Sequence, residues 1–411
     1  MSDQDVLRPA PKGLGAAATA FGMEHVDAVF ALLRAVWPIP RFGKTALVTR
    51  YDDVREAFLS DDAFAVPYAA KLDVIMGGQP FFLGMGDTPQ YRLDTAAMRQ
   101  VVRREDVTPR LTSAFASRAE ALVAQADGRI EVVADLSRRV TFEVLCDYFG
   151  VTDPPGQDLK VITTRLFEFQ FADPGNDPAL RREVDAMAPL LRNHIDGLMA
   201  ARRHGGVEID DVLGRALKRG AAGEPGFSDD QIHSALIGFL VGGVPQPPMV
   251  APQALEQLLR RPAALASAQA AARADDDASL AGHVFEALRF DPLAPALMRT
   301  TVKDHQIAAG TARATVIKAG TTLLVSFRSA MMDPRRIPSP KVFNPRRLPH
   351  EYLHFGYALH TCFGIHINQA VLPLMLKPLL QRQGLRRAPG AEGRLTKRGA
   401  FADRLWVEYE A

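Results

Sequence analysis

The sequence has only two cysteines in 411 residues, Cys146 and Cys362. Two cysteines are too few for a disulfide framework in a chain of this size, and they fit a reducing compartment. The N-terminal stretch lacks the basic-then-apolar layout of a secretory signal, and glycine and proline interrupt the apolar stretch 235–250. We therefore expect a cytoplasmic protein that does not insert into a membrane.

An excess of charge of one sign is also absent. Lysine and arginine number 49 against 47 acidic residues, a formal net charge of +2. This near balance gives no reason to expect a nucleic acid or a membrane surface as partner. The sequence has no phosphate-binding glycine fingerprint after a predicted strand and no cysteine cluster, so we expect no flavin or iron–sulfur segment within it.

Apolar residues recur three and four positions apart through most of the chain, which predicts a mainly α protein with small β-sheets. Ser228, with Gln231 three residues later, forms a capping box that predicts the start of a largely buried helix. The predicted helical stretches are 111–150, 179–203, 228–242, 251–272 and 277–290, and the predicted strands lie near 299–302, 314–317 and 321–326, with a strand leading into a short helix at 45–58.

The two cysteines lie in different surroundings. Cys146 has apolar neighbours at helical spacing, which predicts a buried structural thiol. Cys362 lies in FGYALHTCFG, before an apolar run that can form a helix. Backbone N–H groups at the start of that helix, freed by Gly364, can stabilise a thiolate. Gly356 and Gly364 also permit the main chain to come close to the sulfur. The alternative is a buried structural cysteine in a glycine-rich turn.

This segment resembles the cysteine loop of the cytochrome P450 family, which reads Phe-Gly, three residues, His, one residue, Cys, one residue, Gly. One usual glycine is replaced, by Ala358. The resemblance implies a haem b cofactor (iron protoporphyrin IX) whose iron takes Cys362 as its axial thiolate ligand. It further implies that Phe355 packs beside the sulfur and that His360 donates to a haem propionate.

The resemblance extends over nearly the whole chain, because several weaker motifs follow in the family's order. It implies a single P450-type domain over 1–411, with a helical bundle around a buried haem. A smaller β-rich lobe would be formed by about 30–85 and 299–330 together with the C-terminal strands.

Three charged residues upstream of the cysteine loop support this reading. Glu286 and Arg289 are three apart and share a helix face, and with the FNPRR segment at 343–347 they resemble the family's buried structural ion pair. Arg299, at the start of a β-branched run, matches the basic residue that meets a haem propionate in the family. An ordinary strand-edge arginine is the alternative.

One departure from the family concerns the propionates. Where the family usually has a histidine and, four residues later, an arginine, this chain has Tyr91 and Thr95. Tyr91 can still donate a hydrogen bond. The positively charged partner of the propionate is lost unless Arg92 or Arg99 replaces it. Alternatively, Tyr91 is a packed aromatic residue.

A larger departure lies in the central helix, where the family carries an acid followed by threonine beside the oxygen site. The apolar approach FLVGGV aligns Gly243 with the family's glycine and puts Pro245 and Gln246 in place of the acid and the alcohol. Proline can neither relay a proton nor donate a hydrogen bond, and Gln246 offers only an amide. A wrong register for this alignment is the alternative.

Pro245, Pro247 and Pro248 fall within four residues, and each removes a backbone donor. They predict that the central helix breaks or kinks there. Free carbonyls at the break could then hold ordered water or a polar group of a substrate.

The resemblance implies an oxidoreductase, in the first place a monooxygenase that inserts one oxygen atom into a small molecule with electrons from separate partners such as a ferredoxin and its reductase. The missing acid and alcohol motivate an alternative, a haem-thiolate enzyme that uses a peroxide or rearranges an oxygenated substrate. A non-catalytic haem-binding partner protein is a third. Apolar and aromatic residues in the family's variable pocket positions favour a lipophilic or aromatic substrate. They are Phe81, Phe82, Met85, Phe169, Val241, Leu293 and Phe401.

Overall fold

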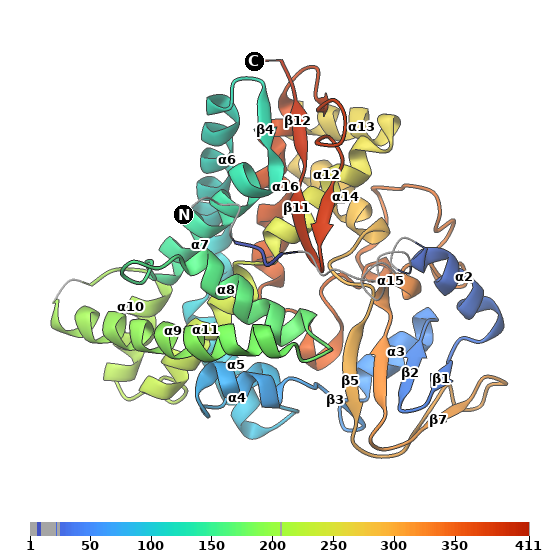
Figure 1. Cartoon of the computed structure of the whole chain (residues 1–411), viewed down its shortest axis with the longest axis horizontal. Coiled ribbons are helices and arrows are strands. Elements are labelled where there is room, and N and C mark those ends of the chain that lie inside the picture. Colours follow the sequence, from blue (N-terminus) through green and yellow to red (C-terminus); the bar gives the residue numbers. More distant parts are fainter. Residues whose placement is uncertain (1–5, 10–21, 23–24, 206–207, 411) are drawn as a thin grey trace.

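Helices form most of the molecule, and a five-stranded sheet lies to one side of them (Figure 1). The computed structural model describes residues 6–9, 22, 25–205 and 208–410. The helices are α2 Val26–Val36, α3 Tyr51–Leu59, α4 Ala69–Met76, α5 Pro89–Val101, α6 Ser113–Gln125, α7 Arg139–Phe149, α8 Leu159–Phe167, α9 Pro178–His204, α10 Val212–Ala221, α11 Asp229–Gly243, α12 Pro247–Leu259, α13 Pro262–Arg273, α14 Asp277–Phe290, α15 Phe327–Ala330 and α16 Ile365–Gln381. The prediction of a mainly α protein with small sheets is confirmed.

Short irregular helices and strands connect these elements. The π-helices are η4 Val107–Thr112, η5 Val132–Arg138 and η6 Glu168–Ala172, and the 3-10 turns are η2 Phe82–Gly84, η3 Arg104–Asp106, η7 Pro349–Glu351 and η8 Ala358–His360. The strands are β1 Arg41–Phe42, β2 Thr45–Val48, β3 Phe64–Ala65, β4 Arg129–Glu131, β5 Leu297–Thr301, β6 His305–Ile307, β7 Thr315–Ile317, β8 Thr322–Val325, β9 Arg386–Arg387, β10 Thr396–Arg398, β11 Phe401–Arg404 and β12 Trp406–Glu408.

The five-stranded sheet has the order β1-β2-β8-β5-β3 and its own hydrophobic core. β2 and β8 run parallel and alternate between partly buried and buried residues, so one face of each strand packs inward. On that side Val54 and Phe58 of α3 join the core. The strands of this sheet come from two stretches of the sequence, 41–65 and 297–325. The β-rich lobe that we expected was to be formed by about 30–85 and 299–330 together with the C-terminal strands.

The C-terminal strands lie elsewhere than we expected. β12 pairs antiparallel with β4 and with β9 at the top of Figure 1, away from the five-stranded sheet at the lower right. β11 pairs with β10 and lies below β12, toward the middle of the molecule. They adjoin α6, α12 and η5, in the helical lobe. β4 also interrupts the stretch 111–150, which the periodicity predicted as helical throughout. Strand pairing between residues almost 300 positions apart leaves no periodic signal in either segment.

The central helix begins at the predicted capping box. The Ser228 hydroxyl accepts from the Gln231 amide N–H, and the Gln231 side chain accepts from the Ser228 N–H at 3.0 Å. The α11–α12 segment Asp229–Leu259 is long and apolar enough to cross a membrane by length and composition, but 72% of its most apolar window is buried inside the protein. It has the burial of a core helix.

Candidate functional site

The Cys362 segment forms a tight loop before α16. The loop passes through η8, and the Cys362 N–H donates to the Phe355 carbonyl at 2.8 Å. Gly356 adopts a φ of 74°, a left-handed conformation that glycine accepts without steric cost. Gly364 is the N-cap of α16. The thiol therefore lies at the start of a long helix, where backbone N–H groups point toward it.

Burial and the neighbouring groups shift the pKa of the Cys362 thiol in opposite directions. Burial raises the pKa of its thiol, while a hydrogen bond from the Gly364 N–H and the charge of Arg99 lower it. Arg99 reaches this loop from α5: it donates to the Phe363 carbonyl at 3.0 Å and stacks over the Phe363 ring at 4.1 Å. An N–H donor and a cation thus stand ready for a negative sulfur, which a bound metal ion would stabilise further.

Ala358 carries backbone strain in the same loop. Its φ is 62°, in the left-handed region that costs a non-glycine residue about 1–2 kcal/mol. This is the position where the P450 loop usually has glycine. The side-chain oxygen of Thr361 donates to the Ala358 carbonyl at 2.8 Å and helps to hold the turn.

We expect Ala358→Gly to stabilise the folded protein by up to about 1 kcal/mol, because release of the strain exceeds the added entropy of glycine in the unfolded chain. Urea unfolding of the two proteins measures the difference. Ala308→Gly, at a buried alanine that also has a positive φ (59°), is the comparison variant and should give a similar gain. A loss of stability in Ala358→Gly would contradict this account.

Arg299 and His360 form a set of donors that suits an anion. Arg299 is 2% exposed, its Nε has no hydrogen-bond partner, and its Nη1 donates only to the neighbouring Met298 carbonyl. Burial lowers the pKa of Arg299, and Tyr68 and Asp61 offset this in part. Burial and the charge of Arg299 lower the pKa of His360 to about 4. A buried cation with an unsatisfied N–H, next to a second donor, fits a carboxylate such as a haem propionate.

Tyr91 and Thr95 have other partners than the resemblance implied. The Tyr91 hydroxyl donates to the Leu359 carbonyl at 2.6 Å, so it supports the cysteine loop instead of presenting its proton to a propionate. Thr95 returns a hydrogen bond to the Tyr91 carbonyl. Arg92 binds Asp87 on the surface and does not replace the missing cation, whereas Arg99 lies against the loop at Phe363.

Glu286 and Arg289 lie at the centre of a buried polar network behind the loop. Both side chains are fully buried and make a two-pronged ion pair at 2.7 and 2.8 Å. The Glu286 carboxylate also accepts from Arg347 at 3.1 Å, from the Asn344 N–H at 2.9 Å and from the Tyr352 hydroxyl at 3.2 Å. The network joins α14 to the residues on both sides of η7. Phe285, next to Glu286, packs edge to face on Phe355 at 5.9 Å.

Aromatic rings connect the loop to the central helix. Phe363 stacks on Phe239 of α11 at 5.3 Å, and Phe82 packs on Phe363 at 5.4 Å. Phe81 lies against Gly238, where an added Cβ would be 2.1 Å from the ring. Sequence reasoning named Phe81 and Phe82 as pocket residues but missed Gly238, Phe239 and Phe363. The sequence held one signal for the close packing of the Phe81 ring on the helix, which was Gly238 inside a predicted helix.

The central helix is interrupted at the predicted place. α11 ends at Gly243 and α12 begins at Pro247. The carbonyls of Val241, Gly243 and Val244 have proline four residues later, so they lack the usual helical donor. Gly242 faces open space, and Gln246 is partly buried.

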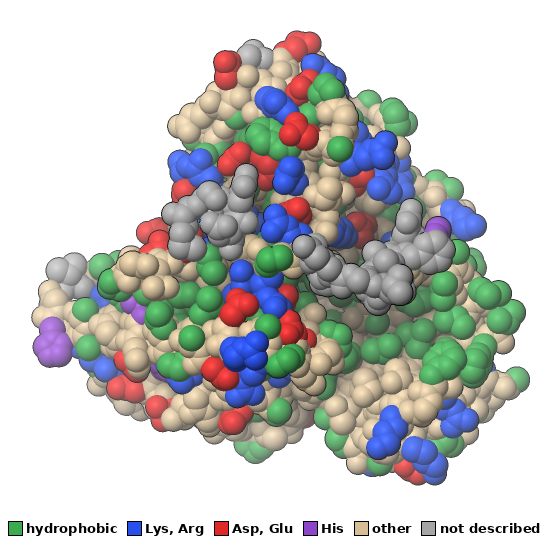
Figure 2. Space-filling view, in the orientation of Figure 1, with side chains coloured by type: hydrophobic (Ala, Val, Ile, Leu, Met, Phe, Trp, Pro, Cys, Tyr) green, Lys and Arg blue, Asp and Glu red, His purple; other side chains and the backbone are tan. Residues whose placement is uncertain are grey.

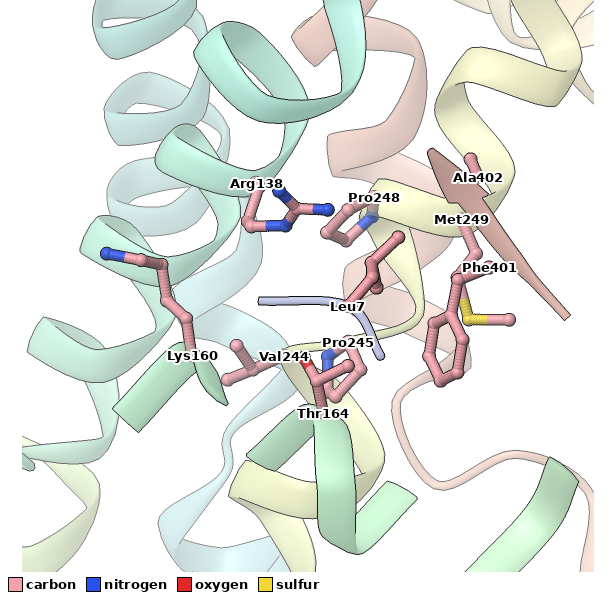
Figure 3. Close-up of a pocket in the computed structure, with 10 residues that line it drawn as sticks. All are labelled: Leu7, Arg138, Lys160, Thr164, Val244, Pro245, Pro248, Met249, Phe401 and Ala402. Carbon is pink, nitrogen blue, oxygen red and sulfur yellow. The ribbon is translucent and has the colours of Figure 1, made fainter. Parts of the chain in front are cut away.

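A small cavity of about 20 Å³, room for about one water molecule, lies at this break (Figure 3). Val244, Pro245 and Pro248 line it from the central helix, and Phe401 lines it from β11. Sequence reasoning had placed Pro245 and Phe401 at the pocket. It missed Met249 and Ala402, which directly follow Pro248 and Phe401, and it missed four lining residues from other segments that carry no motif: Leu7, Arg138, Lys160 and Thr164.

The other predicted pocket residues are scattered around this region. Val241 is buried on α11, and Met85 and Leu293 are partly buried against the main core. Phe169 is buried in η6, with the Lys71 ammonium over its ring at 4.8 Å. This contact ties η6 to α4, because Lys71 also donates to the Phe169 carbonyl at 2.8 Å.

Comparisons with known proteins find similar sequences and similar folds among cytochromes P450. The family model for cytochrome P450 matches residues 280–398. Over 91% of its length the chain is 26% identical to the cytochrome P450 monooxygenase PikC of Streptomyces venezuelae, covering 87% of that protein. The crystal structure of CalO2 superposes with a TM-score of 0.78, at 20% identity, over 95% of this chain and 97% of that one.

A second kind of relative is longer than this chain. A bifunctional dioxygenase (DOX)-epoxy alcohol synthase (EAS) of Fusarium oxysporum (strain Fo5176) is 26% identical over 84% of the chain. The chain spans 30% of that protein and 34% of a protein of the same name from Pyricularia oryzae. It therefore corresponds to about a third of these two fungal relatives.

Proposed function

The chain belongs to the cytochrome P450 superfamily, and from this premise we propose that it is a haem-thiolate oxidoreductase that transfers one oxygen atom to a lipophilic or aromatic small molecule. The observation that carries the proposal is the Cys362 thiol at the start of α16, with the Gly364 N–H and Arg99 beside it. Haem b would be held by Cys362 at the iron and by Arg299 and His360 at its carboxylates.

When bound, a haem held by Cys362 would supply the oxidation chemistry, for which a thiolate ligand is suited. The protein's own residues prepare for this step. The Gly364 N–H and Arg99 favour the thiolate form of Cys362, and Phe355, packed on Phe285, keeps water away from the sulfur. A haem carboxylate would give the buried Arg299 Nε, which has no hydrogen-bond partner in the protein, an acceptor.

A reduced, carbon monoxide-bound absorption spectrum tests the ligand, because a thiolate opposite carbon monoxide shifts the main haem band to a characteristic position. We expect that band from haem-loaded protein. A spectrum typical of a histidine ligand or of no protein ligand would contradict the proposal.

The oxygen source has two candidates. The relatives named as a monooxygenase and as a hydroxylase/epoxidase support dioxygen. The electrons would then come from separate proteins, such as a ferredoxin and its reductase, in the cytoplasm. The α11–α12 break favours a second candidate, a peroxide or an organic hydroperoxide that already carries the oxygen to be transferred. In the alignment with the family, Pro245 and Gln246 take the positions of the acid and the alcohol that would deliver protons to dioxygen. Two relatives are named bifunctional dioxygenase-epoxy alcohol synthases, which also supports this candidate.

Turnover with each oxidant separates these candidates. If the second candidate is right, the peroxide route should exceed the reductase route by at least about tenfold. Pro245 and Gln246, which take the acid and alcohol positions in the alignment, offer neither a carboxyl nor a hydroxyl to relay protons, and such a role is worth about 10²–10⁴-fold in general acid–base catalysis. The assay compares product formation from hydrogen peroxide or a fatty acid hydroperoxide with that from dioxygen, NADPH and surrogate redox proteins. Efficient NADPH-coupled hydroxylation would eliminate the second candidate.

A further inference from the structure

Residues 6–8 reach the interior of the helical lobe although they lie far from the rest of the site in sequence. Val6 is 1% and Leu7 is 7% exposed. The Leu7 side chain lies in the cavity at the helix break, between Pro245 and Pro248 of the central helix and Phe401 of β11 (Figure 3). The N-terminal segment thus contributes a wall to a cavity whose other walls include two residues predicted at the pocket.

Polar contacts hold this segment in place on three sides. The Arg8 guanidinium pairs with Asp177 at 2.7 Å, Glu183 at 3.2 Å and Glu168 at 3.5 Å, and Arg8 is only 20% exposed. Glu168 belongs to η6, Asp177 is the residue before α9, and Glu183 lies in α9. Figure 2 shows that basic and acidic side chains intermix over α8 and α9.

Backbone carbonyls of the segment are also engaged. Arg165 of α8 donates to the Val6 carbonyl at 2.5 Å, and Arg398 of β10 donates to the Leu7 carbonyl at 3.4 Å. Phe167 of α8 packs edge to face on Phe401 at 5.8 Å, beside the cavity. The segment therefore connects α8, α9 and the β10–β11 hairpin, and it fixes the position of Leu7 from both sides.

We propose that Leu7 is a specificity-determining residue that limits how far a ligand can extend past the α11–α12 break, and that Arg8 is a positioning residue that holds Leu7 there. The inference rests on the proposed function, because it takes the cavity at Pro245 and Phe401 to be the far end of a substrate pocket beside a haem held by Cys362. The volume of the cavity admits about one water molecule, so a longer apolar ligand chain fits only when Leu7 is smaller or displaced.

Azole ligands of different length test the proposal without an assay of turnover. Imidazole and 1-octylimidazole are titrated into haem-loaded protein, and the shift of the main haem band reports binding. We expect Leu7→Ala to raise the affinity for 1-octylimidazole relative to imidazole by roughly tenfold, the scale on which a few methylenes are discriminated in an apolar pocket. Imidazole, which is too short to reach Leu7, should bind as before.

Arg8→Ala provides a second variant that leaves Leu7 intact. We expect it to raise both the association and the dissociation rate of 1-octylimidazole in stopped-flow measurements, because the segment loses three ion pairs. Arg336→Ala removes an exposed arginine that pairs with Asp52 and is the matched control, with wild-type rates.

The outcomes distinguish this inference from the proposed function. If wild-type protein shows no spectral shift with imidazole, the assignment of the haem site fails. If imidazole shifts the band while Leu7→Ala and Arg8→Ala both bind 1-octylimidazole with wild-type affinity and rates, the role of residues 6–8 is overturned and the haem site stands.

Discussion

Cys362→Ser is expected to abolish the thiolate spectrum and to lower oxygen-transfer activity by at least about 10²–10³-fold, the loss that removal of a single transition-state hydrogen-bond donor causes in other enzymes. Serine keeps the size of the side chain and the hydrogen bond between the residue 362 N–H and the Phe355 carbonyl, so the loop should retain its shape. Its hydroxyl is far less acidic than a thiol and cannot provide the same electron density to iron.

Cys146→Ser is the matched control, because it makes the same chemical change at the other cysteine. Cys146 is 5% exposed on α7, and burial among apolar residues strongly raises the pKa of its thiol. This variant should keep the carbon monoxide spectrum and lose only some stability, from a buried hydroxyl. If Cys362→Ser kept the wild-type spectrum, or if Cys146→Ser lost it, the assignment of the ligand would be wrong.

Glu286→Gln should destabilise the protein by about 3–5 kcal/mol, the cost of leaving a buried charge without its partner. The substitution removes the only carboxylate that pairs with Arg289, among the residues that the structure describes, and it also takes an acceptor from Arg347. Both arginine side chains are almost completely buried, so water cannot replace the lost charge.

Asp185→Asn removes an ion pair of similar spacing on the surface and serves as the control. Asp185 and Arg181 are each about half exposed, and such pairs contribute about 0–1 kcal/mol. Urea unfolding of haem-free protein measures both variants and keeps cofactor binding out of the comparison. If Glu286→Gln and Asp185→Asn lowered the free energy of unfolding equally, the buried Glu286 network would contribute no more to stability than a surface ion pair.

The sequence by itself determined the local features of this protein. It predicted the helical character, the capping box at Ser228, the interruption of the central helix by its prolines and the loop around Cys362. Each of these depends on residues within one turn or one helix, where spacing and backbone chemistry act directly. It also paired Glu286 with Arg289, because three positions on a helix bring side chains to the same face.

Only the tertiary structure decided which distant segments meet. It directed the Tyr91 hydroxyl to the Leu359 carbonyl, brought Arg99 to the cysteine loop and placed Leu7 in the cavity beside Phe401. It also paired β12 with β4 in the helical lobe. Such contacts join residues that are hundreds of positions apart, and they depend on how whole elements pack, so no periodicity or motif in either segment records them.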